Sequence, residues 1–153
     1  MIVNRKRPNL HSICWTPKGG TNFTGSEITF HVGANFVPDA VYFDGLEGNP
    51  DFEEQVKSGF MVVELPAKKD AKPNQIHKSL AEAVSSLDEK RALEIVACTL
   101  DGVDLKEIIR FDRRRDVVNA AGKQLDNRQA VMNSYQPANQ TYSETAPINM
   151  GEY

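Results

Sequence analysis

The spacing of apolar residues changes once along the chain, and this change constrains the fold more than any other feature. Before the charged segment 67–73, apolar side chains alternate with polar ones, as at Ile28 and Phe30, which is typical of β-strands. After that segment they recur every three or four residues, as on one face of a helix. We therefore predict an α+β fold, with a small β-rich unit at 1–66, a linker at 67–73 and short helices at 74–128.

Turn-forming residues separate the strands predicted in the β-rich unit. Apolar runs predict strands at 2–3, 10–15 and 28–32, and the intervening stretch 16–26 is rich in Gly, Thr, Pro and Asn, which is typical of an exposed hairpin loop. Gly33 is expected to end the third strand, and Pro38 fits the first turn of a short helix.

A stronger helix signal follows at Asn49. Its side chain can cap the helix, and Pro50 suits the first helical position. Phe52 and Val56 then lie on one helical face. Gly59 predicts the stop, before a strand at 60–65.

Capping residues divide the helical segment. Ser86 with Glu89 forms a capping-box pattern, Gly102 predicts a stop, and Asp104 and Asp112 predict the starts of further helices.

The periodic apolar positions of the two units predict the core: Ile28, Phe30, Val32, Phe52, Val56, Met61, Val63, Leu80, Leu93, Val96, Ile108 and Val118.

The last part of the chain, 129–153, is polar and poor in aliphatic residues, so it cannot bury much surface alone. We predict an extended or disordered tail that a partner can order. Spaced apolar side chains, including Tyr135, Tyr142, Ile148 and Tyr153, suit an arm laid across another subunit. The alternative is a solvated tail with no partner.

The residues capable of catalysis are scattered. His11, His31 and His77 fall in separate predicted elements, and Cys14 and Cys98 are far apart in sequence. We interpret the cysteines as reduced thiols, with a disulfide or metal pair as the less favoured alternative. The sequence contains no phosphate-binding glycine motif. We predict no catalytic, cofactor-binding or metal-binding residues, and no cofactor.

Net charge is −3 and the isoelectric point about 5.6, which provides no general attraction to nucleic acid or to an acidic membrane. No apolar run of roughly 18 residues predicts a membrane span. Two basic clusters can be solvated charge or can form ion pairs with the many acidic residues of the chain. The alternative is that they contact an acidic subunit or nucleic acid. With the tail anchors they make up the candidate partner contacts: Arg5, Lys6, Arg7, Arg113, Arg114, Arg115, Tyr135, Tyr142, Ile148 and Tyr153.

Two ordered patterns resemble short structural proteins of tailed bacteriophages. The first is a G-x-N-x-V-P-D turn, then a short helix opening at N-P-x-F, a glycine and an apolar strand. It is carried by Gly33, Asn35, Val37, Pro38, Asp39, Asn49, Pro50, Phe52, Gly59 and the strand at 60–63. The second is a helical pattern carried by Ile95, Thr99, Asp101, Leu105, Asp112, Arg114 or Arg115, Val117 or Val118, Ala121, Gln124 and Leu125.

This resemblance implies a non-enzymatic virion protein made in the host cytoplasm. A connector or collar subunit of the head-to-tail neck is favoured, as a homo-oligomeric ring whose partners are portal, adaptor, capsid or tail subunits. A capsid decoration protein or a tail-associated protein is the first alternative. A nucleic-acid-binding accessory protein that uses the arginine clusters is the second, and no membrane partner is implied.

Overall fold

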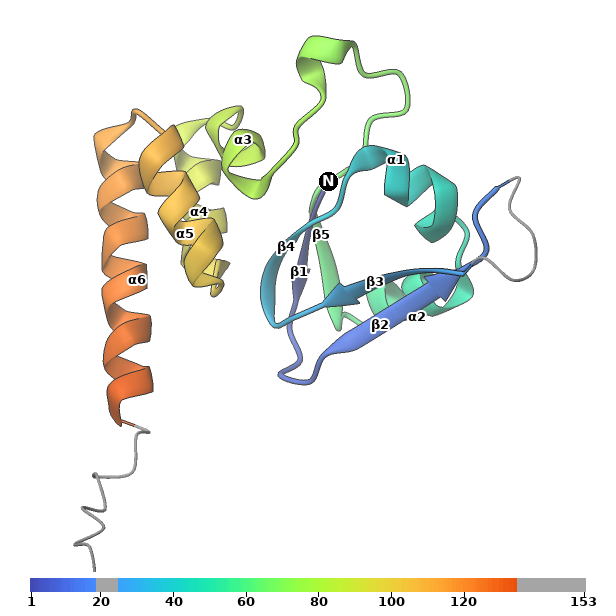
Figure 1. The fold of residues 1–153 in the computed structure, drawn as a ribbon, viewed down its shortest axis with the longest axis horizontal. Coiled ribbons are helices and arrows are strands. Elements are labelled where there is room, and N and C mark those ends of the chain that lie inside the picture. The colour runs from blue at the N-terminus through green and yellow to red at the C-terminus, as the bar shows by residue number, and fades with distance from the viewer. Residues whose placement is uncertain (19–24, 135–153) are drawn as a thin grey trace, which may run out of the picture.

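The computed structural model describes residues 1–18 and 25–134 and shows an α+β fold. At its centre lies a three-stranded antiparallel sheet of β1 (Ile2–Arg5), β4 (Gly33–Phe36) and β5 (Met61–Leu65), in the order β4-β1-β5. The first strand of the chain is therefore the middle strand of the sheet (Figure 1).

A β-hairpin and short helices cover one face of this sheet. The hairpin consists of β2 (His11–Trp15) and β3 (Ser26–Phe30), and the helical elements are α1 (Asp39–Val41), the π-helical turn η1 (Tyr42–Leu46) and α2 (Pro50–Lys57). The rings of Phe30 and Phe52 stack with centroids 6.4 Å apart, which joins the hairpin to α2.

Helices form the other half of the molecule. After the 3₁₀ turn η2 (Pro73–Gln75) come α3 (Leu80–Ser85), α4 (Glu89–Cys98), α5 (Gly102–Phe111) and α6 (Arg115–Ser134). Figure 1 shows α6 running past the ends of α4 and α5.

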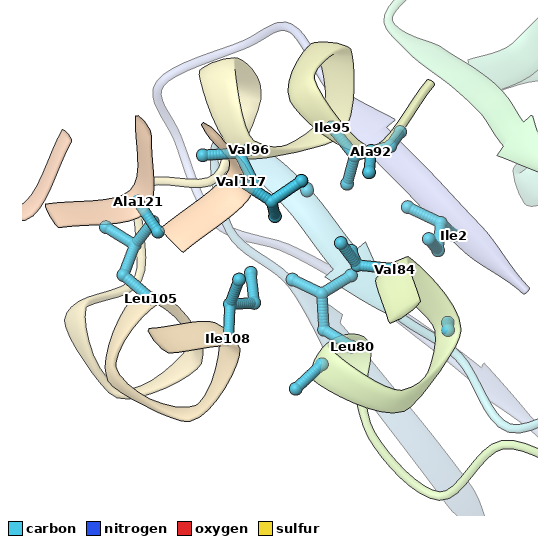
Figure 2. Packing of buried hydrophobic residues seen from close by; sticks show 13 residues of the cluster. Ile2, Leu80, Val84, Ala92, Ile95, Val96, Leu105, Ile108, Val117 and Ala121 are labelled. Carbon is cyan, nitrogen blue, oxygen red and sulfur yellow. The ribbon is translucent and has the colours of Figure 1, made fainter. Parts of the chain in front are cut away.

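The central sheet separates two hydrophobic cores. Alternation along β1 sends Ile2 into the core of the helices and Val3 into the core of the hairpin and α2. Figure 2 shows Ile2 beside Val84 and Ala92, and Ala34 of β4 belongs to the same helical core. The helices therefore pack directly on the β-rich half.

An ion pair also joins the sheet to the helical half. The guanidinium of Arg91, in α4, donates to the Glu64 carboxylate at 2.6 Å and to the Glu64 carbonyl at 2.8 Å. The hydrogen bonds that Arg91 donates to the carboxylates of Glu94 and Glu64 raise the pKa of Arg91.

The turn around Gly33 differs from the sequence-based prediction. The predicted third strand ends at Phe30, and Gly33 begins β4 rather than ending β3. Gly33 has φ +91°, and the Asn35 side chain accepts from His31 N–H and donates to the carbonyls of His31 and Gly33. This local network reverses the chain, so that residues 33–36 can pair with β1.

Asn49 caps α2 as predicted, by accepting from the backbone N–H groups of Asp51 and Phe52. Pro50 begins that helix, and Gly59, at φ +75°, follows its end.

The predicted boundaries of later helices were wrong by a few residues. Asp88 rather than Ser86 caps α4, because its carboxylate accepts from the Arg91 N–H at 2.9 Å. Ser86 instead donates to the Ala83 carbonyl at the end of α3.

The prediction that Gly102 ends a helix was also wrong, because Gly102 is the first residue of α5. Asp101 caps that helix, in place of Asp104. Asp112 ends α5 rather than starting α6.

Helix α6 runs to Ser134, beyond the end predicted at Arg128, so the first residues of the predicted tail are helical. Its core-facing positions are Val117 and Ala121, one turn apart, and Val118 is only half-buried.

Of the other predicted core residues, Phe30, Phe52, Met61, Leu80, Val96 and Ile108 are buried, while Ile28, Val32, Val56, Val63 and Leu93 are half-buried.

Candidate partner-binding surfaces

Arg5, Lys6 and Arg7 lie at the end of β1 and in the turn after it, and they have different surroundings. Arg5 is only 4% exposed, and its guanidinium donates to the Asn9 carbonyl at 2.7 Å and to the Gln55 side chain at 3.3 Å. Lys6 and Arg7 are exposed, and the Arg7 guanidinium lies 3.5 Å from the centroid of the Phe60 ring. Arg5 therefore supports the fold, which differs from its predicted role as a partner contact.

The second basic cluster divides in the same way. Arg113 and Arg115 are exposed, but Arg114 bonds the carboxylate of Asp112 at 2.6 Å and the carbonyls of Leu87 and Val84 at 2.6 and 2.9 Å. The hydrogen bond from Arg114 lowers the pKa of Asp112. Arg114 thus makes intramolecular contacts, including an ion pair with an acidic side chain, which was one of the interpretations of this cluster. Arg113 and Arg115 keep their charges at the surface, and contact of this cluster with a partner stays a prediction.

The predicted tail contacts Tyr135, Tyr142, Ile148 and Tyr153 lie outside the described residues. Their role in binding stays a prediction.

The thiol and imidazole groups have separate environments. Cys14 is exposed, and Cys98 is half-buried with its Sγ 3.2 Å from the Ile95 carbonyl, so burial raises the pKa of the Cys98 thiol. The His11 ring bonds the Asp51 carboxylate at 3.0 Å, which links β2 to the first turn of α2. Within residues 1–18 and 25–134, no group of three or more His, Cys, Asp and Glu side chains could hold a metal ion.

A groove of about 520 Å³ lies beside the last turns of α6. We call it the α6 groove. Its lining combines the β3–β4 turn, the α4–α5 loop and α6: Val32, Leu100, Gln124, Asn127, Arg128 and Val131. The side chains of Leu100 and Val131 are 37% and 55% exposed, so the groove presents apolar surface at the outside of the molecule.

Sequence reasoning did not identify the α6 groove. Val32 continues the alternating pattern of β3 and was therefore predicted to lie in the core. Leu100 directly follows Thr99, and Val131 lies in the stretch that was predicted to be tail. The only signal was that Leu100 and Val131 are apolar residues, which does not show that they come together.

A second hollow, of about 370 Å³, opens beside α2. Its lining includes Met1, Tyr42, Phe52, Val56 and Val63, which belong to or pack against the hairpin-side core. This hollow is therefore continuous with the core of the β-rich half, whereas the α6 groove is formed at the junction between the sheet and the helices.

None of the helices in the described part of the chain combines the length and the hydropathy needed to cross a membrane. Comparison with known proteins found no matching family model, no similar curated protein and no similar solved structure.

Proposed function

We propose that this chain is a non-enzymatic structural subunit of a tailed bacteriophage virion, located in the head-to-tail neck. Copies of the chain form a ring there and bridge portal, adaptor, capsid or tail subunits. Capsid decoration or another tail-associated position is the alternative within the same class.

The observation that carries this proposal is the α6 groove. A subunit that bridges neighbours needs an exposed apolar surface that its own fold leaves open, because such surfaces are where protein partners bind. Within the described part of the chain, the α6 groove exposes the apolar side chains of Leu100 and Val131, and it lies beside the last turns of α6.

The residues of the bacteriophage-like pattern also support the proposal, since they have architectural roles. Gly33 and Asn35 shape the turn into β4, and Asn49 with Pro50 begins α2. Because these residues determine the path of the backbone, proteins that share the pattern are expected to share that path.

The exposed cations give a second, weaker support. Lys6 and Arg7 lie on one turn, Arg113 lies in the loop before α6, and Arg115 is the first residue of α6. Guanidinium and ammonium groups at the rim of an interface steer association with acidic partners, and they do so without adding much to its affinity.

The direct test is the protein content of purified particles from the phage that encodes the chain. We expect the chain to co-purify with particles through a density gradient, at a fixed ratio to the portal protein in quantitative mass spectrometry. Recovery only in the lysate, free of particles, would overturn the virion assignment and favour the accessory protein.

Loss of the gene separates the positions within the virion. If the chain belongs to the neck, phage lacking it should accumulate heads without joined tails, and the gene supplied in trans should restore joining. Complete virions with fragile heads would instead indicate decoration of the capsid.

A further inference from the structure

We propose that the α6 groove binds residues 135–153 of a neighbouring copy of the same chain. This inference rests on the proposed ring and names the contact that would hold its subunits together. Two observations support it. The groove is apolar and is lined by one cationic residue, Arg128, and it lies close to the point in the chain where an apolar and acidic segment, 135–153, begins.

One wall of the α6 groove, which carries Val32 and Leu100, is fixed by close contacts between the sheet and the end of α4. A Cβ built on Gly33 would lie 2.5 Å from the Cys98 carbonyl oxygen and 3.0 Å from Cγ of Leu100. The backbone of the β3–β4 turn is thus in direct contact with the loop that carries Leu100. A groove wall held in this way is preformed, which reduces the entropy cost of binding.

Helix α6 forms the opposite wall and is fixed in the same region. The Gln124 side chain donates to the carbonyls of Ala97 and Thr99, each at 3.3 Å, at the end of α4. The Arg128 guanidinium lies over the start of α5, where a Cβ on Gly102 would come 3.1 Å from its Nη1. Both walls therefore have positions set by the fold itself.

The groove suits a ligand with apolar side chains and negative charge. Among the described residues that line the groove, Arg128 is the only charged one, and the others are apolar residues and two amides. A volume of about 520 Å³ is within the usual range for sites that accept several side chains of a ligand.

Residues 135–153 have the complementary composition. They contain no Lys or Arg, and their two charged residues are Glu144 and Glu152. Their apolar side chains are separated by polar ones, as in segments that bind in extended form. The apolar members include Tyr142, Ile148 and Met150.

The segment is long enough to reach a neighbouring copy. If extended, residues 135–153 would span roughly 60 Å, about twice the length of α6. The groove lies beside the last turns of α6, so a segment would have to double back directly after Ser134 to enter its own groove. Donation to the next copy needs no such reversal, and repeated by rotation it closes a ring.

Photo-crosslinking of the full chain tests this inference. A benzophenone amino acid replaces Tyr142, and heavy-isotope-labelled and unlabelled chains are mixed before irradiation over a range of concentrations. We expect crosslinked peptides that pair the segment of one isotope with groove residues near Leu100 or Arg128 of the other. Links within one isotope only would mean that each segment occupies its own groove, and links outside the groove, or none, would equally overturn the proposal.

Groove variants supply the controls. Leu100→Glu should lower the yield of mixed-isotope links about tenfold, whereas Leu10→Glu, at an exposed apolar position outside the groove, should leave it unchanged. If Leu100→Glu fails to fold by circular dichroism, Arg128→Glu replaces it. Arg128→Glu should also lower the yield of mixed-isotope links. Adding Glu144→Lys and Glu152→Lys to the Arg128→Glu chain should restore that yield, and failure of this charge exchange would contradict the proposed pairing.

The outcome can be separated from that of the proposed function. Particles that contain the Leu100→Glu chain at the normal ratio would leave the virion role intact and reject the groove contact. Mixed-isotope links in a chain that is absent from particles would support the groove and reject the virion role.

Discussion

The carboxylate of Asp112 and the guanidinium of Arg114 lie 2.6 Å apart at the junction of α5 and α6. The same guanidinium reaches the carbonyls of Val84 and Leu87, where α3 ends. Val84 lies in the last turn of α3 and Leu87 just after it, so this one side chain links the end of α3 to the junction of α5 and α6.

Replacing this guanidinium should therefore destabilise the helical half. We expect Arg114→Met to lower the free energy of unfolding by about 2–3 kcal/mol, since it leaves the Asp112 carboxylate, whose side chain is 2% exposed, without its ion-pair partner. Urea unfolding followed by circular dichroism measures the change. Arg113→Met, at the exposed neighbouring position, is the control and should stay within about 0.5 kcal/mol of the parent.

The free energy of unfolding should fall in acid, because protonation removes the charge of carboxylates that are hydrogen-bonded in the folded state. Hydrogen bonds from Arg114 lower the folded-state pKa of Asp112, and those from Trp15 and Lys18 lower the pKa of Asp44. A carboxyl with a depressed folded pKa contributes its full stabilisation above the unfolded value, about 3.9, and loses it as pH falls through the folded pKa. Urea midpoints measured from pH 7 downward should drop below about pH 4.

Two variants check the sign of this pH dependence. Asp112→Asn should flatten the acid loss of stability. Burial, with help from Asp101, raises the pKa of Asp104, so protonation of Asp104 favours the folded state. Asp104→Asn should therefore not flatten the acid loss, and equal slopes for the two variants would contradict the assignment.

Gly33 should tolerate no side chain. Gly33→Ala combines a left-handed backbone, φ +91°, with a Cβ 2.5 Å from the Cys98 carbonyl oxygen, so we expect a loss of about 2–4 kcal/mol. Gly48→Ala is the matched control, because Gly48 has φ +73° and nothing within 4 Å of the added Cβ. It should cost only about 1 kcal/mol. Similar losses in thermal unfolding for both variants would show that the contact with Cys98 does not matter.

Phe52 should be a sensitive aromatic position of the β-rich half. It is 5% exposed and stacks on Phe30, so Phe52→Ala should cost about 3 kcal/mol in urea unfolding. Phe111, at 53% exposure, provides the comparison, and Phe111→Ala should change stability by less than about 0.5 kcal/mol. A change that small at Phe52 would contradict its burial between α2 and the hairpin.

Some features were predictable because their cause is local. Asn49 and Pro50 begin α2 through contacts within one turn, and the change in apolar spacing across 67–73 was sufficient to predict the α+β class. Errors of a few residues arose where two caps compete nearby. Ser86 and Asp88 can each begin a helix, and in the structure Ser86 ends α3 while Asp88 begins α4.

The tertiary structure alone decided which charges face inward and where a partner surface forms. Arg5 and Arg114 have exposed basic neighbours in sequence, yet Arg5 is buried and Arg114 half-buried. Their hydrogen bonds to Gln55 and to the carbonyls of Val84 and Leu87 are contacts with residues far along the chain. The α6 groove likewise brings together Val32, Leu100 and Val131 from three separate segments. Contacts between residues far apart in sequence depend on how the elements pack, and short-range patterns carry no information about that packing.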